Sequence, residues 1–136
     1  MKRIIGLLAL IFTLCLFLPV MAAAADEGLP AGVIMAPDKM NWSDAKAYCA
    51  SQSCRLPLLN GKNRIPGSQN IPSDIPVEVF GSDGAKWPSG LPFGHYWLGT
   101  ERNTRPGHAW KVFDSNGRVI VTFASKHDEL HAICIP

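Results

Sequence analysis

The stretch AWKVFDSNGRVIVTF, residues 109–123, decides the fold because it contains two strand patterns joined by one tight turn. Residues 109–113 alternate in side-chain character, which is typical of a strand with two different faces. Asn116-Gly117 follows, and a type I′ turn needs positive φ at both of its central residues, which Asn and Gly tolerate best. Residues 119–123 then return as a second strand. The stretch therefore predicts an antiparallel β-hairpin.

Further strands are expected on both sides of this hairpin. Residues 95–98, within GHYWLGTE, form a strand candidate with Trp97 directed into the core. Residues 130–135 read as the last strand, and residues 32–35 (GVIM) as the first, ended by Pro37. Because Trp42, Trp97 and Trp110 all lie on periodic segments, we expect them in the core.

One amphipathic helix precedes these central strands. Asn41 is a good N-cap residue, and Trp42, Ala45 and Cys49 recur at helical spacing. We therefore expect a helix over residues 42–51.

The segment between the helix and residue 92 is broken by proline and glycine, which exclude long helices. A short helix is expected near residues 75–80, closed by Gly81. Loops this long are uncommon in compact domains, so apolar anchors should hold it down. The expected anchors are Leu56, Leu59, Phe80 and Trp87. The order of elements predicts an α+β fold with a mainly antiparallel sheet, one main helix and a long irregular region.

The N-terminus reads as a secretory signal peptide. Lys2 and Arg3 precede a nearly unbroken apolar run, and small residues end at Ala25 before Asp26. We expect residues 1–25 to be removed and residues 26–136 to form one domain, exported to the periplasm or beyond the cell. No membrane span is expected after cleavage.

The charge and cysteine content of the expected domain restrict its partners. Without Lys2 and Arg3, eleven Lys and Arg face eleven Asp and Glu, so no nucleic-acid partner is indicated. Three cysteines remain, Cys49, Cys54 and Cys134, in a compartment that favours disulfides. Because three is odd, one thiol should be free or joined to another chain.

Six motifs occur in order: WSDAKAYC, CRLP, WPSG, YWLGTE, AWKVFDSNG and a last strand with a cysteine. Together they resemble a bacterial C-type-lectin-like domain, of the type found in Legionella collagen-like adhesins and in the C-terminal adhesion domains of invasin-like proteins. The resemblance covers roughly residues 40–135. The matching residues are Trp42, Ala45, Tyr48, Cys49, Arg55, Leu56, Pro57, Tyr96, Trp97, Trp110, Val112, Gly117 and Cys134.

The resemblance implies that the helix cysteine pairs with the last-strand cysteine, here Cys49 with Cys134. Such a bridge closes a long loop and would contribute roughly 4 kcal/mol. Cys54–Cys134 and Cys49–Cys54 remain rival pairs, although the second closes only a tiny loop. Cys54 itself is not part of the family pattern.

Two further stretches depart from the family. Residues 58–61 (LLNG) replace a Thr and a Glu-Leu helix, so the second helix of the family is not expected in its usual place. Leu98-Gly99 stands where the close relatives have Ser-Ser-Thr, and instead looks like a strand of animal C-type lectins.

No metal, cofactor or catalytic group is expected. Calcium needs several oxygen ligands in one place, and the triplets with which C-type lectins bind it are absent. HDELH, residues 127–131, has its Glu in the wrong place for a zinc-protease motif and is read as a polar loop. Cys54 is read as a buried or intermolecular thiol rather than a nucleophile.

The resemblance therefore implies a calcium-independent adhesion or binding module, without catalysis, for a protein or surface glycan. Residues 87–95 and 100–108 are expected to hold the ligand, because exposed aromatic and Arg side chains are typical of recognition surfaces. Trp87 has an equally good reading as a residue that seals its loop. The candidate residues are Trp87, His95, Glu101, Arg102, Asn103, Arg105 and His108. The alternative is a structural or inhibitory envelope subunit in a stable complex, with Cys54 as a candidate link to its partner.

Overall fold

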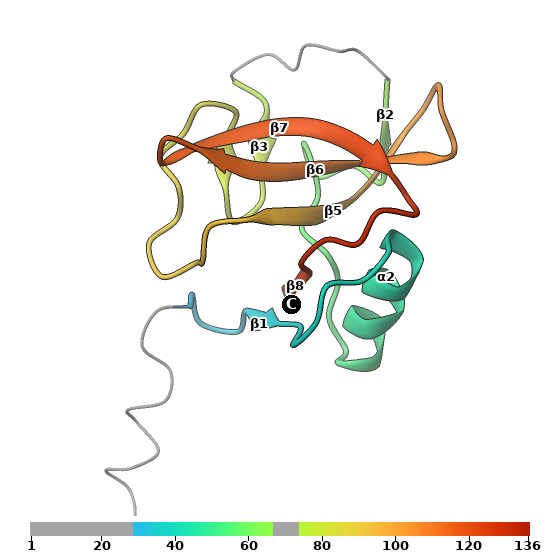
Figure 1. Cartoon of the computed structure of the whole chain (residues 1–136), viewed down its shortest axis with the longest axis horizontal. Helices are drawn as coiled ribbons and strands as arrows, with labels where there is room; N and C mark the ends of the chain where they lie inside the picture. Colours follow the sequence, from blue (N-terminus) through green and yellow to red (C-terminus); the bar gives the residue numbers. More distant parts are fainter. Residues whose placement is uncertain (1–28, 67–73) are drawn as a thin grey trace, which may run out of the picture.

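The computed structural model describes residues 29–66 and 74–136, so the expected signal peptide lies outside the described residues. Its elements, in chain order, are β1 (Ile34–Met35), α2 (Trp42–Ser51), β2 (Arg64–Ile65), β3 (Pro76–Val77), β4 (Gly81–Ser82), β5 (His95–Arg102), β6 (His108–Ser115), β7 (Arg118–Ser125) and β8 (Ile133–Cys134). One short helix and mostly antiparallel strands form a small α+β domain, as the sequence predicts (Figure 1).

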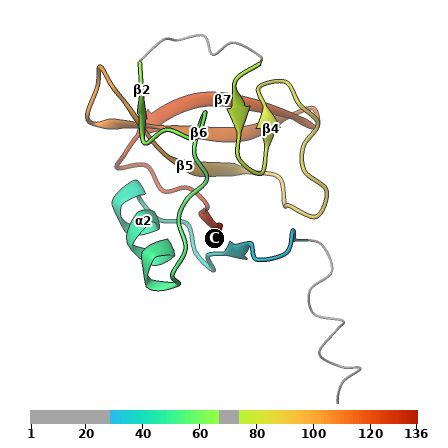
Figure 2. The same ribbon diagram turned by 180° about the vertical axis from the view of Figure 1, so that it is seen from behind.

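The largest sheet has four strands in the order β2-β5-β6-β7. Its predicted hairpin is confirmed: β6 and β7 pair in register from His108↔Ser125 to Ser115↔Arg118. Asn116 and Gly117 have φ values of +51° and +76°, the positive values that a two-residue turn requires. β2 instead pairs parallel with β5, at the end where Glu101 lies (Figure 2).

The β5 strand is covered on both faces. Tyr96 and Leu98 pack into one core cluster, and Trp97 between them packs into a second cluster against α2; all three side chains are fully buried. This explains why YWL is continuously apolar rather than alternating. The expected core positions of the three tryptophans, Trp42, Trp97 and Trp110, are confirmed.

Two indole hydrogen bonds fasten the helix region to β5. Trp42 Nε1 donates to the Leu98 carbonyl, and Trp97 Nε1 donates to the Met40 carbonyl, both at 2.9 Å. The helix begins as expected, with the Asn41 side chain accepting from a backbone N–H of its first turn. Because buried indole N–H groups need acceptors, these bonds also orient the two rings.

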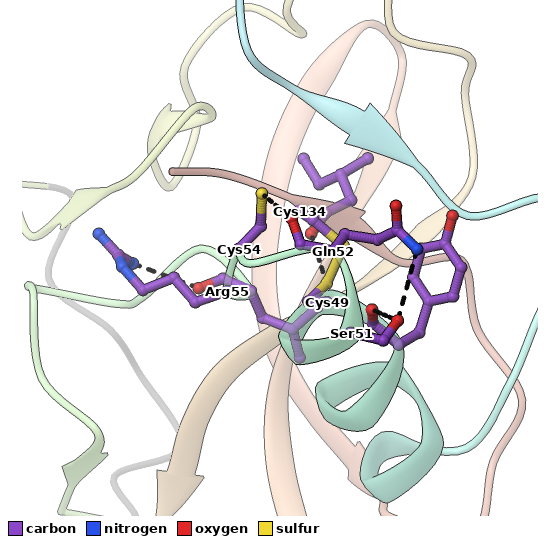
Figure 3. The surroundings of a disulfide bond; sticks show 9 residues. Cys49, Ser51, Gln52, Cys54, Arg55 and Cys134 are labelled. Carbon is purple, nitrogen blue, oxygen red and sulfur yellow. Dashed lines mark hydrogen bonds between the residues drawn. A yellow bond between two sulfur atoms is a disulfide. The ribbon is translucent and has the colours of Figure 1, made fainter.

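The disulfide implied by the family resemblance is confirmed. Cys49 of α2 and Cys134 of β8 are bonded across 85 residues, and both are fully buried (Figure 3). α2 and the antiparallel pair of β1 and β8 lie on the same side of the large sheet (Figure 1). The bridge therefore ties the helix to the C-terminal strand beneath the sheet.

The irregular region contains one wrong prediction. Residues 75–80 are not helical: β3 and β4 pair antiparallel, and Val79 in the turn between them has a φ of +70°. Backbone hydrogen bonds to residues 58–60 hold this segment extended, so tertiary pairing overrides local preference. All four expected anchors, Leu56, Leu59, Phe80 and Trp87, are buried.

The expected terminal strands are shorter than predicted. Within residues 130–135 only Ile133–Cys134 is a strand, although isolated bridges join Leu130, His131 and Ile135 to three separate parts of the chain. The segment is extended throughout, but its partners change along its length. It therefore links several elements instead of extending one sheet.

Candidate binding site

The predicted binding residues lie at the two ends of β5 and do not form one surface. His95 begins the strand and Arg102 ends it. An eight-residue strand spans roughly 25 Å at about 3.3 Å per residue. The loop that precedes β5 and the turn that follows it accordingly lie on opposite sides of the molecule in Figure 1.

Trp87 does not offer an exposed ring. Its side chain is 5% exposed, and its ring packs against Phe80 and Tyr96 with centroids 5.5 and 5.8 Å away. Its Nε1 donates to the Leu91 carbonyl at 2.8 Å. Of the two readings of this residue, the structure shows the one in which the indole seals the loop.

The far end of β5 is largely committed to internal contacts. Arg102 is only 6% exposed, and its guanidinium lies 3.7 Å from the centre of the Phe123 ring. Burial tends to raise the pKa of Glu101, but hydrogen bonds from Lys126 and Arg64 outweigh it and lower that pKa. Two of the predicted binding residues, Glu101 and Arg102, are therefore used in contacts within the domain.

The other residues predicted at this end differ in exposure. His108 is partly buried, with its ring edge-on to Phe123 at 5.8 Å, whereas Asn103 and Arg105 are exposed on the turn between β5 and β6. Only these last two remain free surface candidates there.

The His95 end of β5 contains a pocket of about 530 Å³. Its walls come from four segments: Lys39 before α2, residues 93–95 at the start of β5, Lys111 on β6, and residues 128–131 before β8. We call it the imidazole pocket, because both of the histidines in these segments line it. Its volume lies in the range of small-molecule sites.

His95 is held on one wall by two neighbours on β6. Its ring stacks on Phe113, with centroids 4.9 Å apart and planes 12° from parallel. Lys111 Nζ lies 2.9 Å from His95 Nδ1. An ammonium has no acceptor, so Nδ1 accepts this bond and the proton of the neutral ring is on Nε2.

The second pocket histidine, His131, is placed by backbone bonds to β5. Its N–H donates to the His95 carbonyl, and its own carbonyl accepts from Trp97 N–H, both at 3.0 Å. Its ring packs on Tyr96 at 5.2 Å. A Cβ at Gly94 would lie 3.0 Å from the ring, so the glycine is needed for this approach.

Burial and nearby lysines act on the pKa values of both imidazoles. The pKa of His95 is lowered by burial and by Lys111, Lys39 and His131, with Asp114 opposing. The pKa of His131 is lowered by burial and by Lys39. Burial also lowers the pKa of Lys111, and Asp128 opposes this shift. Burial is the first cause in each case, because it disfavours the charged form, and neighbouring lysines add to the effect on the two histidines.

Phe93 stands at the mouth of the imidazole pocket, and 66% of its surface is exposed. Among the described residues it is the large apolar side chain that remains in solvent. The sequence points to its loop, KWPSGLPFGH, but within that loop Trp87, and not Phe93, was the candidate, with the exposed and the loop-sealing readings left open. The indole of Trp87 fills the core, and the Phe93 ring stays in solvent with its centroid 6.1 Å from that indole.

Lys39, Lys111 and His131 were missed as site residues. They are far apart in the chain, and each has an ordinary reading as a polar surface residue. Only His131 gave a sequence signal, through HDELH, and that motif was interpreted as a polar loop. Tertiary pairing alone brings the three to one pocket.

A second hollow of about 240 Å³ lies between α2 and β5 and contains Cys54. Cys54 is the free cysteine of the described chain, as the odd count predicted, and its side chain is half-buried. Its Sγ lies 3.3 Å from the Gln52 carbonyl and is not joined to the nearby Cys49–Cys134 bridge (Figure 3).

Within residues 29–66 and 74–136, no three His, Cys, Asp or Glu side chains are grouped so that they could hold a metal ion. No helix in the same ranges is long and apolar enough to cross a membrane.

Comparison with known proteins finds no matching protein-family model, curated protein or solved structure. The imidazole pocket is therefore interpreted from its own chemistry.

Proposed function

We propose that this protein is an exported binding module, periplasmic or extracellular, with a C-type-lectin-like fold and no catalytic activity. It recognises a protein or surface glycan through the imidazole pocket and without calcium. The observation that carries this proposal is the exposed Phe93 ring at the mouth of a pocket lined by hydrogen-bonding side chains. An apolar surface beside a few convergent polar groups is the usual composition of a ligand site.

The disulfide supports the proposed fold, because it joins the helix to the last strand at the two cysteines that match the family motifs. The short turn between β5 and β6 supports calcium independence. Residues 103–107 contain no carboxylate, and calcium sites are built mainly from carboxylate and carbonyl oxygens.

The test is binding of the purified protein to an array of glycans and envelope proteins, with and without EDTA. The same array is probed with Phe93→Ala and with Arg105→Ala, an exposed residue at the opposite end of β5. We expect EDTA and Arg105→Ala to leave binding unchanged and Phe93→Ala to remove it. Binding that needs Arg105 but not Phe93 would place the site at the other end of the strand.

The half-exposed Cys54 favours a second candidate function, that of a structural or inhibitory envelope subunit held in a complex. A covalent adduct through this thiol would appear on non-reducing electrophoresis of the exported protein and would vanish in Cys54→Ser. A monomer in both samples rejects a covalent complex.

A further inference from the structure

The imidazole pocket presents hydrogen-bond donors to a ligand. Lys111 donates one N–H to His95 Nδ1, which leaves two N–H groups for a ligand. The Nε2–H of His95 is a further donor. Lys39 lines the same pocket, and its ammonium makes no ion pair or hydrogen bond within the described part of the chain. The His131 ring nitrogens likewise have no hydrogen-bond partner among the described residues. An array of donors suits an anionic, acceptor-rich group.

Two carboxylates at the rim limit the charge of that anion. Asp128 and Glu129 are exposed and line the pocket, but neither forms an ion pair with its lysines in the described ranges. With the imidazoles neutral, two ammonium groups are balanced by two carboxylates. A doubly charged phosphate would therefore leave more uncompensated negative charge in the pocket than a ligand with one carboxylate would. The same carboxylates can accept hydrogen bonds from hydroxyl groups.

The Phe93 ring adds an apolar surface next to these polar groups. A sugar ring presents one face of C–H groups, which can pack on an aromatic face while its hydroxyls point to polar partners. The pocket thus combines cationic donors, hydroxyl acceptors and an apolar platform.

We infer that the imidazole pocket binds a saccharide bearing a single carboxylate, of the uronic acid class. The inference rests on the proposed binding function and names its ligand. The carboxylate accepts from Lys39, Lys111 and the imidazole N–H groups, the hydroxyls donate to Asp128 and Glu129, and the sugar ring covers Phe93. The C-terminal carboxylate of a peptide carries the same charge but brings no hydroxyls to the rim.

The electrostatics of the free pocket agree with an anionic ligand. Cationic neighbours contribute to the lowered pKa values of His95 and His131: Lys39 acts on both, and Lys111 acts on His95, where Asp114 opposes it. A bound carboxylate offsets these positive charges. It should therefore raise both histidine pKa values, which provides a readout specific to this pocket.

The experiment is an NMR titration of the disulfide-bonded exported protein, observing the ring signals of His95 and His131. Four probes are compared: sodium D-glucuronate, D-glucose, D-glucose 6-phosphate and the dipeptide glycyl-phenylalanine. We expect saturable shifts with glucuronate at concentrations about fivefold lower than for glucose, as one ion-pair-scale contact of about 1 kcal/mol provides, and lower than for the other two probes.

Matched variants test the residues. Lys39→Met should weaken glucuronate binding about fivefold, while Lys62→Met, the same change at an exposed site outside the pocket, should not. His131→Gln should weaken it as well, and His127→Gln, at the other end of HDELH, should have no effect. The exposed variants leave the core untouched, and the ring-current shifts of the protein report an intact fold.

Glucuronate binding that is no tighter than glucose binding, or equal losses in Lys39→Met and Lys62→Met, would overturn the inference. Tighter binding of the dipeptide would also overturn it but would leave the proposed function standing, since the pocket would then recognise a protein. If no probe shifts the two histidines and the array shows no dependence on Phe93, both proposals fail.

Discussion

Removal of the Cys49–Cys134 bridge should cost this domain a large part of its stability. The bridge joins residues 85 apart, and both cysteines are fully buried. In the chain-entropy model a loop of this length contributes about 4.5 kcal/mol at 25 °C, because the cross-link restricts the unfolded chain. Domains of this size have free energies of unfolding of about 5–15 kcal/mol, so the variant should be marginally stable.

The measurement is equilibrium urea unfolding of Cys49→Ala/Cys134→Ala, followed by tryptophan fluorescence. Cys54→Ala is the matched control, since it also removes a cysteine but breaks no bridge. We expect a loss of about 4–5 kcal/mol in the double variant and of less than about 1 kcal/mol in the control. Comparable losses in the two proteins, or a loss below about 1 kcal/mol in the double variant, would refute the reasoning.

Three further predictions concern the turn, the indole bond and the pocket. Gly117→Ala should lower the free energy of unfolding by about 1–2 kcal/mol, measured in urea, because φ is +76° there. Trp42→Phe should cost about 2 kcal/mol in the same assay, since it leaves the buried Leu98 carbonyl without its indole donor. The folded pKa values of His95 and His131 are lowered, so below about pH 6.5 the unfolded chain binds more protons than the folded chain. The free energy of unfolding should therefore decrease as the pH is lowered through this range. NMR titration should give midpoints below 6.5 for both, and replacing both by Gln should flatten the stability profile between pH 7 and 5.

Local sequence rules predicted the elements that depend on local chemistry. Asn116-Gly117 indicated the hairpin because few other residues accept positive φ in succession. Asn41 and the spacing of Trp42, Ala45 and Cys49 marked the helix correctly. These features were predictable because their energies come from neighbours along the chain.

The same rules failed where a segment's partner is distant. Residues 75–80 were expected to be helical, but backbone hydrogen bonds with residues 58–60 hold them extended. Whether Trp87 is exposed or seals its loop also depended on whether its ring fits beside Phe80 and Tyr96. No local pattern contains that information.

The sequence by itself determined the α+β class, the hairpin, the helix and the odd cysteine. Tertiary structure alone decided the candidate site. The length of β5 separated His95 from Arg102, and the bridge between Tyr96 and His131 brought HDELH to the start of that strand. The physical reason is that a pocket is defined by distances between side chains, and those distances exist only after distant segments have packed together.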